Sequence, residues 1–279
     1  MLRFLLRPLL LVLAGYGFYL GLLYVQQRSI MFPGVDLPAD TTPPPHNASV
    51  LHLPASFGKA RALMLRSPDV VGPAPAVLYF HGNYELAQHN LELLAPLTEL
   101  GMHVLLVEYP GYAGSEGSPS RDSINEAATA SYDWLLRQPD VDTDRIIAIG
   151  RSIGSGPASE LSQSRRLRGV VLLSPYTSIA DLAWGMAAPP WLIRDRFDNR
   201  AALRQFDGPT LIFHGRDDEI IPFSHSEVLA SLGPSVRLVE MSGGHNDVDY
   251  FGVEFMHELQ RFLRQTDILT EQPSTSVLN

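Results

Sequence analysis

From about residue 76 onward, short apolar runs alternate with segments of helical spacing. Ala76–Phe80 and Ile146–Ile149 are strand-like, whereas Gln88–Leu100 carries leucine at every third position from residue 91. The other strand-like runs are Val104–Val107, Val170–Leu173, Leu211–Phe213 and Val236–Met241, and the other helical segments are Ile124–Leu136, Gly154–Ser162, Ser224–Leu232 and Val253–Leu263. This alternation predicts an α/β fold with a mostly parallel central sheet and helices on both faces. Such sheets bind ligands beyond the carboxyl ends of their strands.

The N-terminal region carries an uncharged apolar run, Leu9–Val25. Its length is at the short end of a transmembrane span, so we expect an N-terminal transmembrane helix within a membrane anchor of residues 1–32. A cleaved signal peptide and a buried core helix are the alternatives. Arg3 and Arg7 precede the run and Arg28 follows it, which predicts a cytoplasmic N-terminus and a folded domain on the opposite side of the membrane.

Charge and composition narrow the remaining organisation. The net charge is −9, and beyond the first 28 residues 18 basic side chains face 30 acidic ones, so we expect no nucleic-acid partner. The absence of cysteine excludes disulfides, thiolate metal sites and a cysteine nucleophile. Residues 33–48 are rich in Pro, Asp and Thr and predict an extended linker. A folded domain over 49–266 and a disordered tail over 267–279 complete the expected organisation.

Gly150-Arg151-Ser152-Ile153-Gly154 matches the pattern G-x-S-x-G between a strand and a helix. A sharp turn at this point lifts the serine hydroxyl above the sheet edge, so Ser152 is the candidate nucleophile. The backbone N–H of Ile153 is then the expected oxyanion donor. The alternative is a structural or phosphate-type turn; a P-loop is excluded because no Gly-Lys-Ser/Thr follows.

Candidate partners for Ser152 follow in the order acid then histidine. The strand Leu211–Phe213 leads into a loop with Asp217 and Asp218, and these residues alone leave open which of the two is the acid. His245 follows a later strand and two glycines and is the candidate general base. On the other side, Asn83 follows the strand Ala76–Phe80 and is the first choice for the second oxyanion N–H, with Tyr84 the second choice.

Together these motifs resemble the α/β-hydrolase superfamily, and most closely its membrane-anchored depalmitoylase-like and serine-aminopeptidase-like groups. The matching stretches are FHGN (80–83), VEYPGYAGSEGSPS (107–120), GRSIGSGPA (150–158), LSPYTS (173–178), RDRFDN (194–199), HGRDDEIIPFSH (214–225) and GGHND (243–247). The resemblance implies the α/β-hydrolase fold, and its H-G-x-x-D pattern selects Asp218 as the acid.

Two positions depart from the family pattern. Ala113 replaces the last glycine of G-Y-G, which predicts an altered turn there. A bulky Tyr84 follows HGN, where it is expected either to narrow the acyl site or to shift the oxyanion loop.

The segment from Pro175 to Gly208 is long for a simple crossover and contains Trp184, Met186 and Trp191. It is either core packing or a small apolar cap over Ser152 that binds an acyl group.

The resemblance implies a serine hydrolase that cleaves an ester or thioester through an acyl-enzyme, without metal or organic cofactor. The expected partners are a small-molecule or lipid-like acyl substrate and, through the N-terminal helix, the membrane. The alternatives are a peptidase or amidase of the serine-aminopeptidase type and a non-catalytic membrane-bound binding protein.

Overall fold

A computed structural model describes residues 2–39, 43–44, 48–68 and 70–269. Its centre is one sheet in the order β1-β2-β4-β3-β5-β6-β7-β8. The strands are β1 (Ala48–Ala55), β2 (Gly58–Leu65), β3 (Ala74–Phe80), β4 (His103–Val107), β5 (Val141–Arg151), β6 (Gly169–Leu173), β7 (Thr210–Gly215) and β8 (Val236–Met241). From β4 to β8 all neighbours are parallel, whereas β1 and β2 form an antiparallel hairpin at the edge beside β4. The predicted α/β-hydrolase fold is confirmed.

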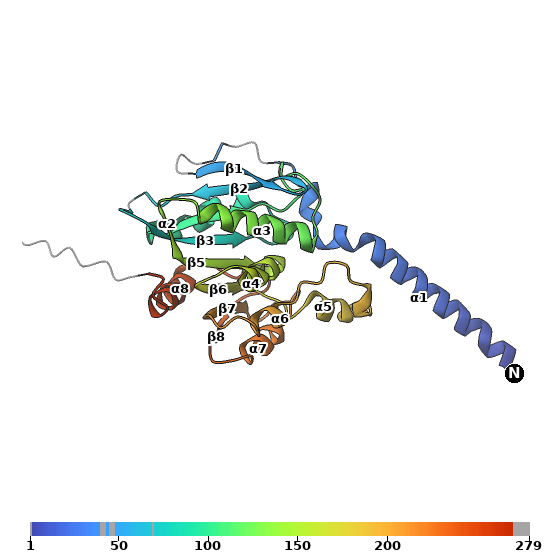
Figure 1. The fold of residues 1–279 in the computed structure, drawn as a ribbon. Coiled ribbons are helices and arrows are strands. Elements are labelled where there is room, and N and C mark those ends of the chain that lie inside the picture. The colour runs from blue at the N-terminus through green and yellow to red at the C-terminus, as the bar shows by residue number, and fades with distance from the viewer. Residues whose placement is uncertain (1, 40–42, 45–47, 69, 270–279) are drawn as a thin grey trace, which may run out of the picture.

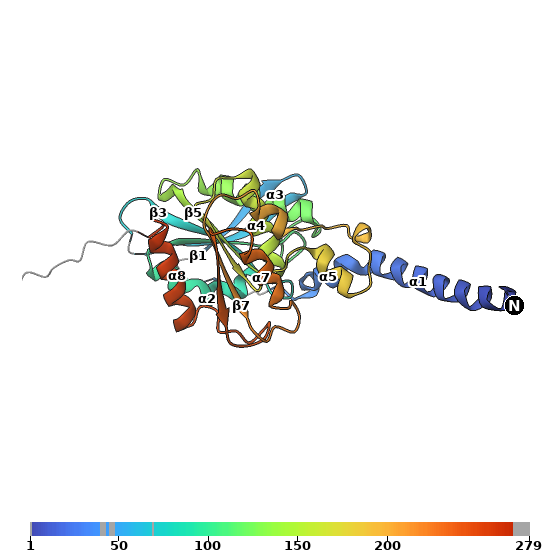
Figure 2. The same ribbon diagram turned by 90° about the horizontal axis from the view of Figure 1, so that it is seen from below.

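Helices cover both faces of the sheet (Figures 1 and 2). One face packs against α2 (Leu91–Glu99) and α8 (Val253–Gln265), and the other against α3 (Arg121–Leu135) and α4 (Ser155–Ser164). Because both faces are covered, every residue of β3, β4, β6 and β7 is buried. This burial explains why these strands are continuous apolar runs rather than alternating ones.

The remaining elements lie in the connections. They are α5 (Ile179–Gly185), α6 (Asn199–Leu203) and α7 (Ser224–Ala230), with the short 3-10 helices η2 (Ala87–Asn90), η3 (Ser152–Gly154) and η4 (Pro190–Leu192). The edge hairpin β1–β2 was not among the predicted strands. Its first strand is half-exposed and lacks the apolar run that marked the central strands.

The helix α1 (Leu2–Met31) extends away from the body, and its C-terminal half approaches α5 (Figure 1). Its segment Arg7–Met31 is long and apolar enough to cross a membrane. At its end the side chain of Phe32 is fully buried in the body. The helix α1 is thus attached to the body through a packed aromatic side chain that directly follows it.

Parts of the segments predicted as an extended linker and a disordered tail are packed on the body. Residues Pro33–Asp36 form the 3-10 helix η1, and the Gly34 N–H donates to the Asn83 carbonyl oxygen at 3.1 Å, so the first part of the expected extended linker is packed on the body. Residues 40–42 and 45–47 of that linker lie outside the described residues. At the other end Ile268 is fully buried against the α8 face of the sheet. The packed chain therefore runs beyond residue 266, and 270–279 lie outside the described residues.

Candidate active site

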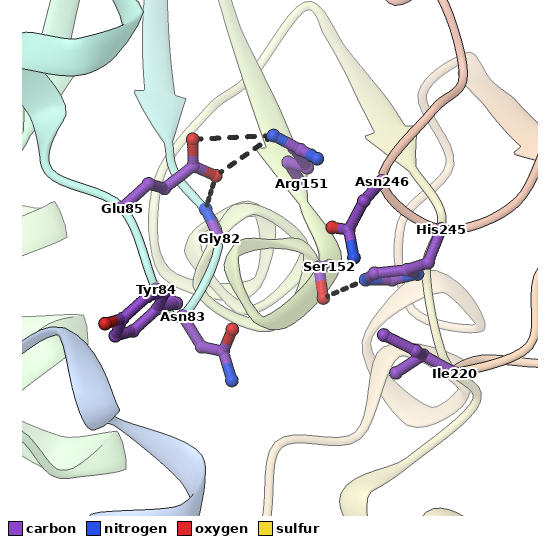
Figure 3. Close-up of a pocket in the computed structure, with 9 residues that line it drawn as sticks. All are labelled: Gly82, Asn83, Tyr84, Glu85, Arg151, Ser152, Ile220, His245 and Asn246. Carbon is purple, nitrogen blue, oxygen red and sulfur yellow. Dashed lines mark hydrogen bonds and ion pairs between the residues drawn. The ribbon is translucent and has the colours of Figure 1, made fainter.

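The candidate site is a cavity of about 360 Å³ at the carboxyl ends of the parallel strands (Figure 3). Its walls come from loops that follow four different strands. They are residues 82–85 after β3, Arg151 and Ser152 at the end of β5, Ile220 after β7, and His245 and Asn246 after β8. The topology therefore brings together residues that are up to 164 positions apart, as expected for the carboxyl edge of a parallel sheet.

The turn at Ser152 is tight and conformationally strained. Ser152 has a φ of 52°, in the left-handed region that non-glycine residues rarely adopt. A Cβ on Gly150 would collide with the backbone of Gly154, and a Cβ on Gly154 with the carbonyl oxygen of Phe80. The two glycines of the motif are thus required by close backbone approach, and they let β5 pass directly into η3 with the serine at the turn.

His245 connects Ser152 to Asp218. Its Nε2 lies 3.0 Å from Ser152 Oγ, and its Nδ1 lies 2.7 Å from Asp218 Oδ2. An ionised carboxylate only accepts hydrogen bonds, so Nδ1 carries the proton and Nε2 presents a lone pair to the serine hydroxyl. The arrangement can therefore take a proton from Ser152 and hold the resulting imidazolium beside a negative charge.

The Asp218 carboxylate is buried and has four hydrogen-bond partners. Besides His245, it accepts the N–H groups of Ile220 at 3.0 Å and Ile221 at 2.7 Å, and it lies 3.1 Å from His214 Nε2. Burial alone would raise the pKa of Asp218, but the hydrogen bonds from His214, His245 and the Ile221 N–H hold that pKa well below its usual range. Asp218 is thus ionised at neutral pH.

The other carboxylates of this loop lie elsewhere. Asp217 is exposed and donates its backbone N–H to the Gly243 carbonyl oxygen at 3.2 Å. Glu219 accepts the backbone N–H of His245 at 3.2 Å rather than its ring. Of the two aspartates that the residues left open, the structure brings Asp218 to His245, as the resemblance implied.

The loop after β3 faces Ser152 and is held from behind. The carbonyl oxygen of Asn83 accepts the Gly34 N–H at 3.1 Å and the Tyr112 hydroxyl at 2.9 Å. These bonds hold the peptide unit that joins Asn83 to Tyr84, the two residues predicted as alternative oxyanion donors, and the exposed ring of Tyr84 lines the cavity. Ile153, the other predicted donor, follows Ser152 in η3 and has a buried side chain.

One wall of the cavity is an ion pair that our sequence analysis missed. Arg151 Nη1 lies 3.4 Å from Glu85 Oε1, and Glu85 also accepts the N–H of Gly82 and the Asn90 side-chain amide. Figure 3 shows Glu85 and Arg151 meeting above Ser152. The position of Arg151 beside the serine in the motif was the available signal. Asn246 and Ile220 were also missed, although Asn246 follows His245 directly.

The predicted cap is not over Ser152. Trp184 and Trp191 are 68% and 69% exposed, and neither they nor Met186 line the cavity. Instead Ala183, Ala188 and Leu192 of the same segment pack against Leu20 and Leu23 of α1. The interpretation of Trp184, Met186 and Trp191 as acyl-binding residues is therefore wrong, because the apolar segment that contains them packs against α1 and not over the cavity.

The amino-acid sequence of this chain matches a family model and several known proteins. A family model described as "Alpha/beta hydrolase family" matches residues 77–250. A Mycobacterium tuberculosis protein described as uncharacterised is 35% identical over 206 residues, 71% of this chain and 73% of that protein. The alpha/beta hydrolase domain-containing protein aho-3 of Caenorhabditis elegans is 32% identical over 190 residues, 67% of this chain and 57% of aho-3.

Solved structures show the same fold at lower identity. Est1E from Butyrivibrio proteoclasticus superimposes with a TM-score of 0.65 at 18% identity, covering 78% of this chain and 98% of Est1E. The Pyrococcus furiosus esterase Pf2001 superimposes with a TM-score of 0.67 at 18% identity, covering 82% and 95% of the two chains. At such identity the likeness concerns the fold.

Proposed function

Because the chain belongs to the alpha/beta hydrolase family, we propose that it is a serine hydrolase that cleaves an ester or thioester through an acyl-enzyme. One observation carries the proposal: a continuous chain of hydrogen bonds from Ser152 Oγ through His245 to the Asp218 carboxylate, at the wall of a cavity. A hydroxyl, an imidazole and a buried carboxylate in this order are the groups that acyl transfer requires.

In the proposed first step, Ser152 Oγ attacks the substrate carbonyl carbon while His245 Nε2 takes the hydroxyl proton. The negative charge that develops on the carbonyl oxygen is accepted by the backbone N–H groups of Ile153 and Asn83. His245 then gives its proton to the departing alcohol or thiol, which leaves the acyl group on Ser152. In the second step His245 takes a proton from a water molecule, the hydroxide adds to the acyl carbon, and Ser152 leaves with the proton.

The walls of the cavity support an ester or thioester over a peptide. A peptidase of the aminopeptidase type needs a carboxylate that is free to bind the substrate amine. Among the cavity-lining residues of the described chain, Glu85 is the one carboxylate, and it is already paired with the Arg151 side chain, the Gly82 N–H and the Asn90 side-chain amide. Ile220 and the Tyr84 ring offer apolar surface for an acyl group on the open side.

Labelling with a fluorophosphonate tests the proposal. The full-length protein should be labelled and should hydrolyse aryl esters and acyl thioesters, whereas Ser152→Ala should lose both properties and keep its thermal unfolding transition. Ser164→Ala is the matched control, because Ser164 is an exposed serine at the far end of α4, the helix that follows the turn at Ser152. Persistent labelling of Ser152→Ala, or its loss in Ser164→Ala, would contradict the assignment of Ser152.

A further inference from the structure

The segment from Leu182 to Ile193, with the sequence LAWGMAAPPWLI, contains no charged residue. It comprises the end of α5, a turn and η4, and Figures 1 and 2 both show it beside α1. Trp184 and Trp191 are mostly exposed on it, and Met186 is half-exposed. Large apolar side chains displayed in this way need a nonaqueous partner.

We propose that residues 182–193 insert into the lipid bilayer next to α1, as a second membrane-embedded element on the side of the folded domain. The partner is the acyl-chain region of one leaflet. The proposal rests on α1 crossing the bilayer and is independent of the hydrolase chemistry.

The depth of the segment follows from its contacts along α1. The Tyr16 hydroxyl donates to the Ala187 carbonyl oxygen at 2.8 Å, and the Tyr19 hydroxyl donates to the Met186 carbonyl oxygen at 2.7 Å. At about 1.5 Å of rise per residue, Tyr19 and Tyr16 lie roughly 9 and 14 Å along the helix from Val25, where the uncharged run ends. The turn at 186–187 therefore sits level with the middle of the span.

An aqueous position for this turn is incompatible with the span. If the turn were in water, Tyr16–Val25 would be in water too, and only Leu9–Gly15 of the uncharged run would remain for the membrane. Seven helical residues cover about 10 Å, a third of the roughly 30 Å of hydrocarbon that a span must cross. Either α1 does not cross the bilayer or the turn enters it.

The polar backbone groups of the turn have hydrogen-bond partners within the protein, which a nonaqueous environment requires because no water is available there. The N–H groups of Met186 and Ala187 donate to the carbonyl oxygens of Ala183 and Trp184, each at 2.9 Å. Residues 189 and 190 are both proline and bring no N–H. The carbonyl oxygens of 186 and 187 are the ones that the α1 tyrosine hydroxyls reach, and Leu192 O accepts the Gln27 side-chain amide at 3.3 Å. This pairing also explains tyrosines in the middle of an apolar helix.

Cationic side chains mark the level where the segment would leave the membrane. Arg194 lies 5.6 Å from the centre of the Tyr24 ring, and Arg28 is paired with the buried Asp195 at 2.7 Å. Arg196 donates to the carbonyl oxygens of Trp191 and Ile193 at 3.0 and 2.8 Å. Arginine and tyrosine at the end of an apolar run are typical of the headgroup region, where lipid phosphates accept their hydrogen bonds.

The absence of cysteine allows a direct test by site-directed spin labelling of the full chain. Trp184→Cys and Trp191→Cys place labels on the segment, Leu11→Cys places one on exposed α1, and Val71→Cys places one on the fully exposed loop before β3. Each labelled protein is reconstituted in phosphatidylcholine–phosphatidylglycerol vesicles. Collisions with oxygen, which concentrates in lipid, are compared with collisions with a water-soluble nickel chelate.

We expect the labels at 184 and 191 to resemble the Leu11 label, with an oxygen-to-nickel ratio several-fold above that of the Val71 label. Labels at 184 and 191 that resemble the Val71 label would overturn the proposal, and so would a water-accessible Leu11 label, because α1 would then not span the bilayer.

A second measurement, of tryptophan fluorescence, needs no cysteine variant. In Trp134→Phe, whose two remaining tryptophans are Trp184 and Trp191, brominated phosphatidylcholine should quench most of the emission, and unquenched emission would contradict insertion.

Discussion

At the scale of single residues, the site depends on which carboxylate faces His245. Asp218 Oδ2 lies 2.7 Å from His245 Nδ1, whereas the neighbouring Asp217 is exposed. Asp218→Asn presents an amide that can donate to Nδ1, which favours the wrong tautomer of His245. We expect turnover to fall by roughly 10³–10⁴-fold, by analogy with serine proteases, and Asp217→Asn to cost about tenfold or less. Steady-state kinetics on one aryl ester checks both.

Reversed losses in these two variants would mean that Asp217 is the partner of His245. Equally large losses would indicate that the two carboxylates act together. Either result would contradict the assignment of Asp218 as the sole acid.

Ala113 stands where the family pattern has glycine, and it has a φ of 38°. An alanine in this left-handed conformation is strained, so Ala113→Gly should raise the free energy of unfolding by about 0.5–1 kcal/mol, after the greater freedom of glycine in the unfolded chain is subtracted. Denaturant titration measures the change. Ala130→Gly, within α3, is the control and should instead lower stability by about 1 kcal/mol. A loss of stability in both variants would mean that the turn at 113 is not strained.

At the scale of elements, the 3-10 helix η1, which follows α1, is hydrogen-bonded to the loop that faces Ser152. A Cβ on Gly34 would collide with the Tyr112 ring and lie 2.9 Å from the Asn83 carbonyl oxygen. Gly34→Ala should therefore displace the loop 82–85 and lower kcat by about ten- to a hundredfold, because small displacements of oxyanion donors are costly. Steady-state kinetics in detergent measures the effect.

Gly21→Ala is the matched control for this substitution. No atom lies within 4 Å of a Cβ built on Gly21, which lies in α1, the helix that precedes Gly34. Its activity should equal that of the parent protein. Unchanged kcat in Gly34→Ala would show that the loop 82–85 tolerates movement of η1.

At the scale of the whole molecule, the cavity and α1 lie at the same end of the body. The strands β3 and β5 deliver the cavity at their carboxyl ends, and α5 and the C-terminal half of α1 lie beyond that edge (Figure 1). If α1 spans the bilayer, the cavity opens close to the membrane surface, and acyl substrates held in that membrane are present at high effective concentration.

We therefore expect a long-chain acyl ester in the same proteoliposomes to be cleaved about tenfold or more faster than the same ester supplied in separate vesicles. A water-soluble acetate ester, which needs no membrane, should be cleaved at equal rates in both settings. Initial rates at matched total substrate decide the comparison. Equal rates for the long-chain ester would contradict the expectation that the cavity takes its substrate from the bilayer in which α1 is embedded.

The local pattern of the sequence determined much of this molecule by itself. Continuous apolar runs predicted the central parallel strands, because strands buried on both faces must be apolar throughout. A strand, the motif of residues 150–154 and a helix predicted the turn at Ser152, because both glycines are demanded by backbone contacts within a few residues or with the adjacent strand. The separate loops after the strands also predicted that Asn83 and His245 would converge at one edge.

Only the tertiary structure decided which neighbour each surface meets. The choice of Asp218 over Asp217 depends on the path of one loop past His214 and Ile221, which the alternation of residues does not specify. The pairing of Glu85 with Arg151 joins two loops far apart along the chain. An apolar segment such as 182–193 must be covered, but its composition is the same whether the cover is a catalytic cavity, an anchor helix or lipid. Burial sets how apolar a segment is, and the arrangement of the other elements sets what buries it.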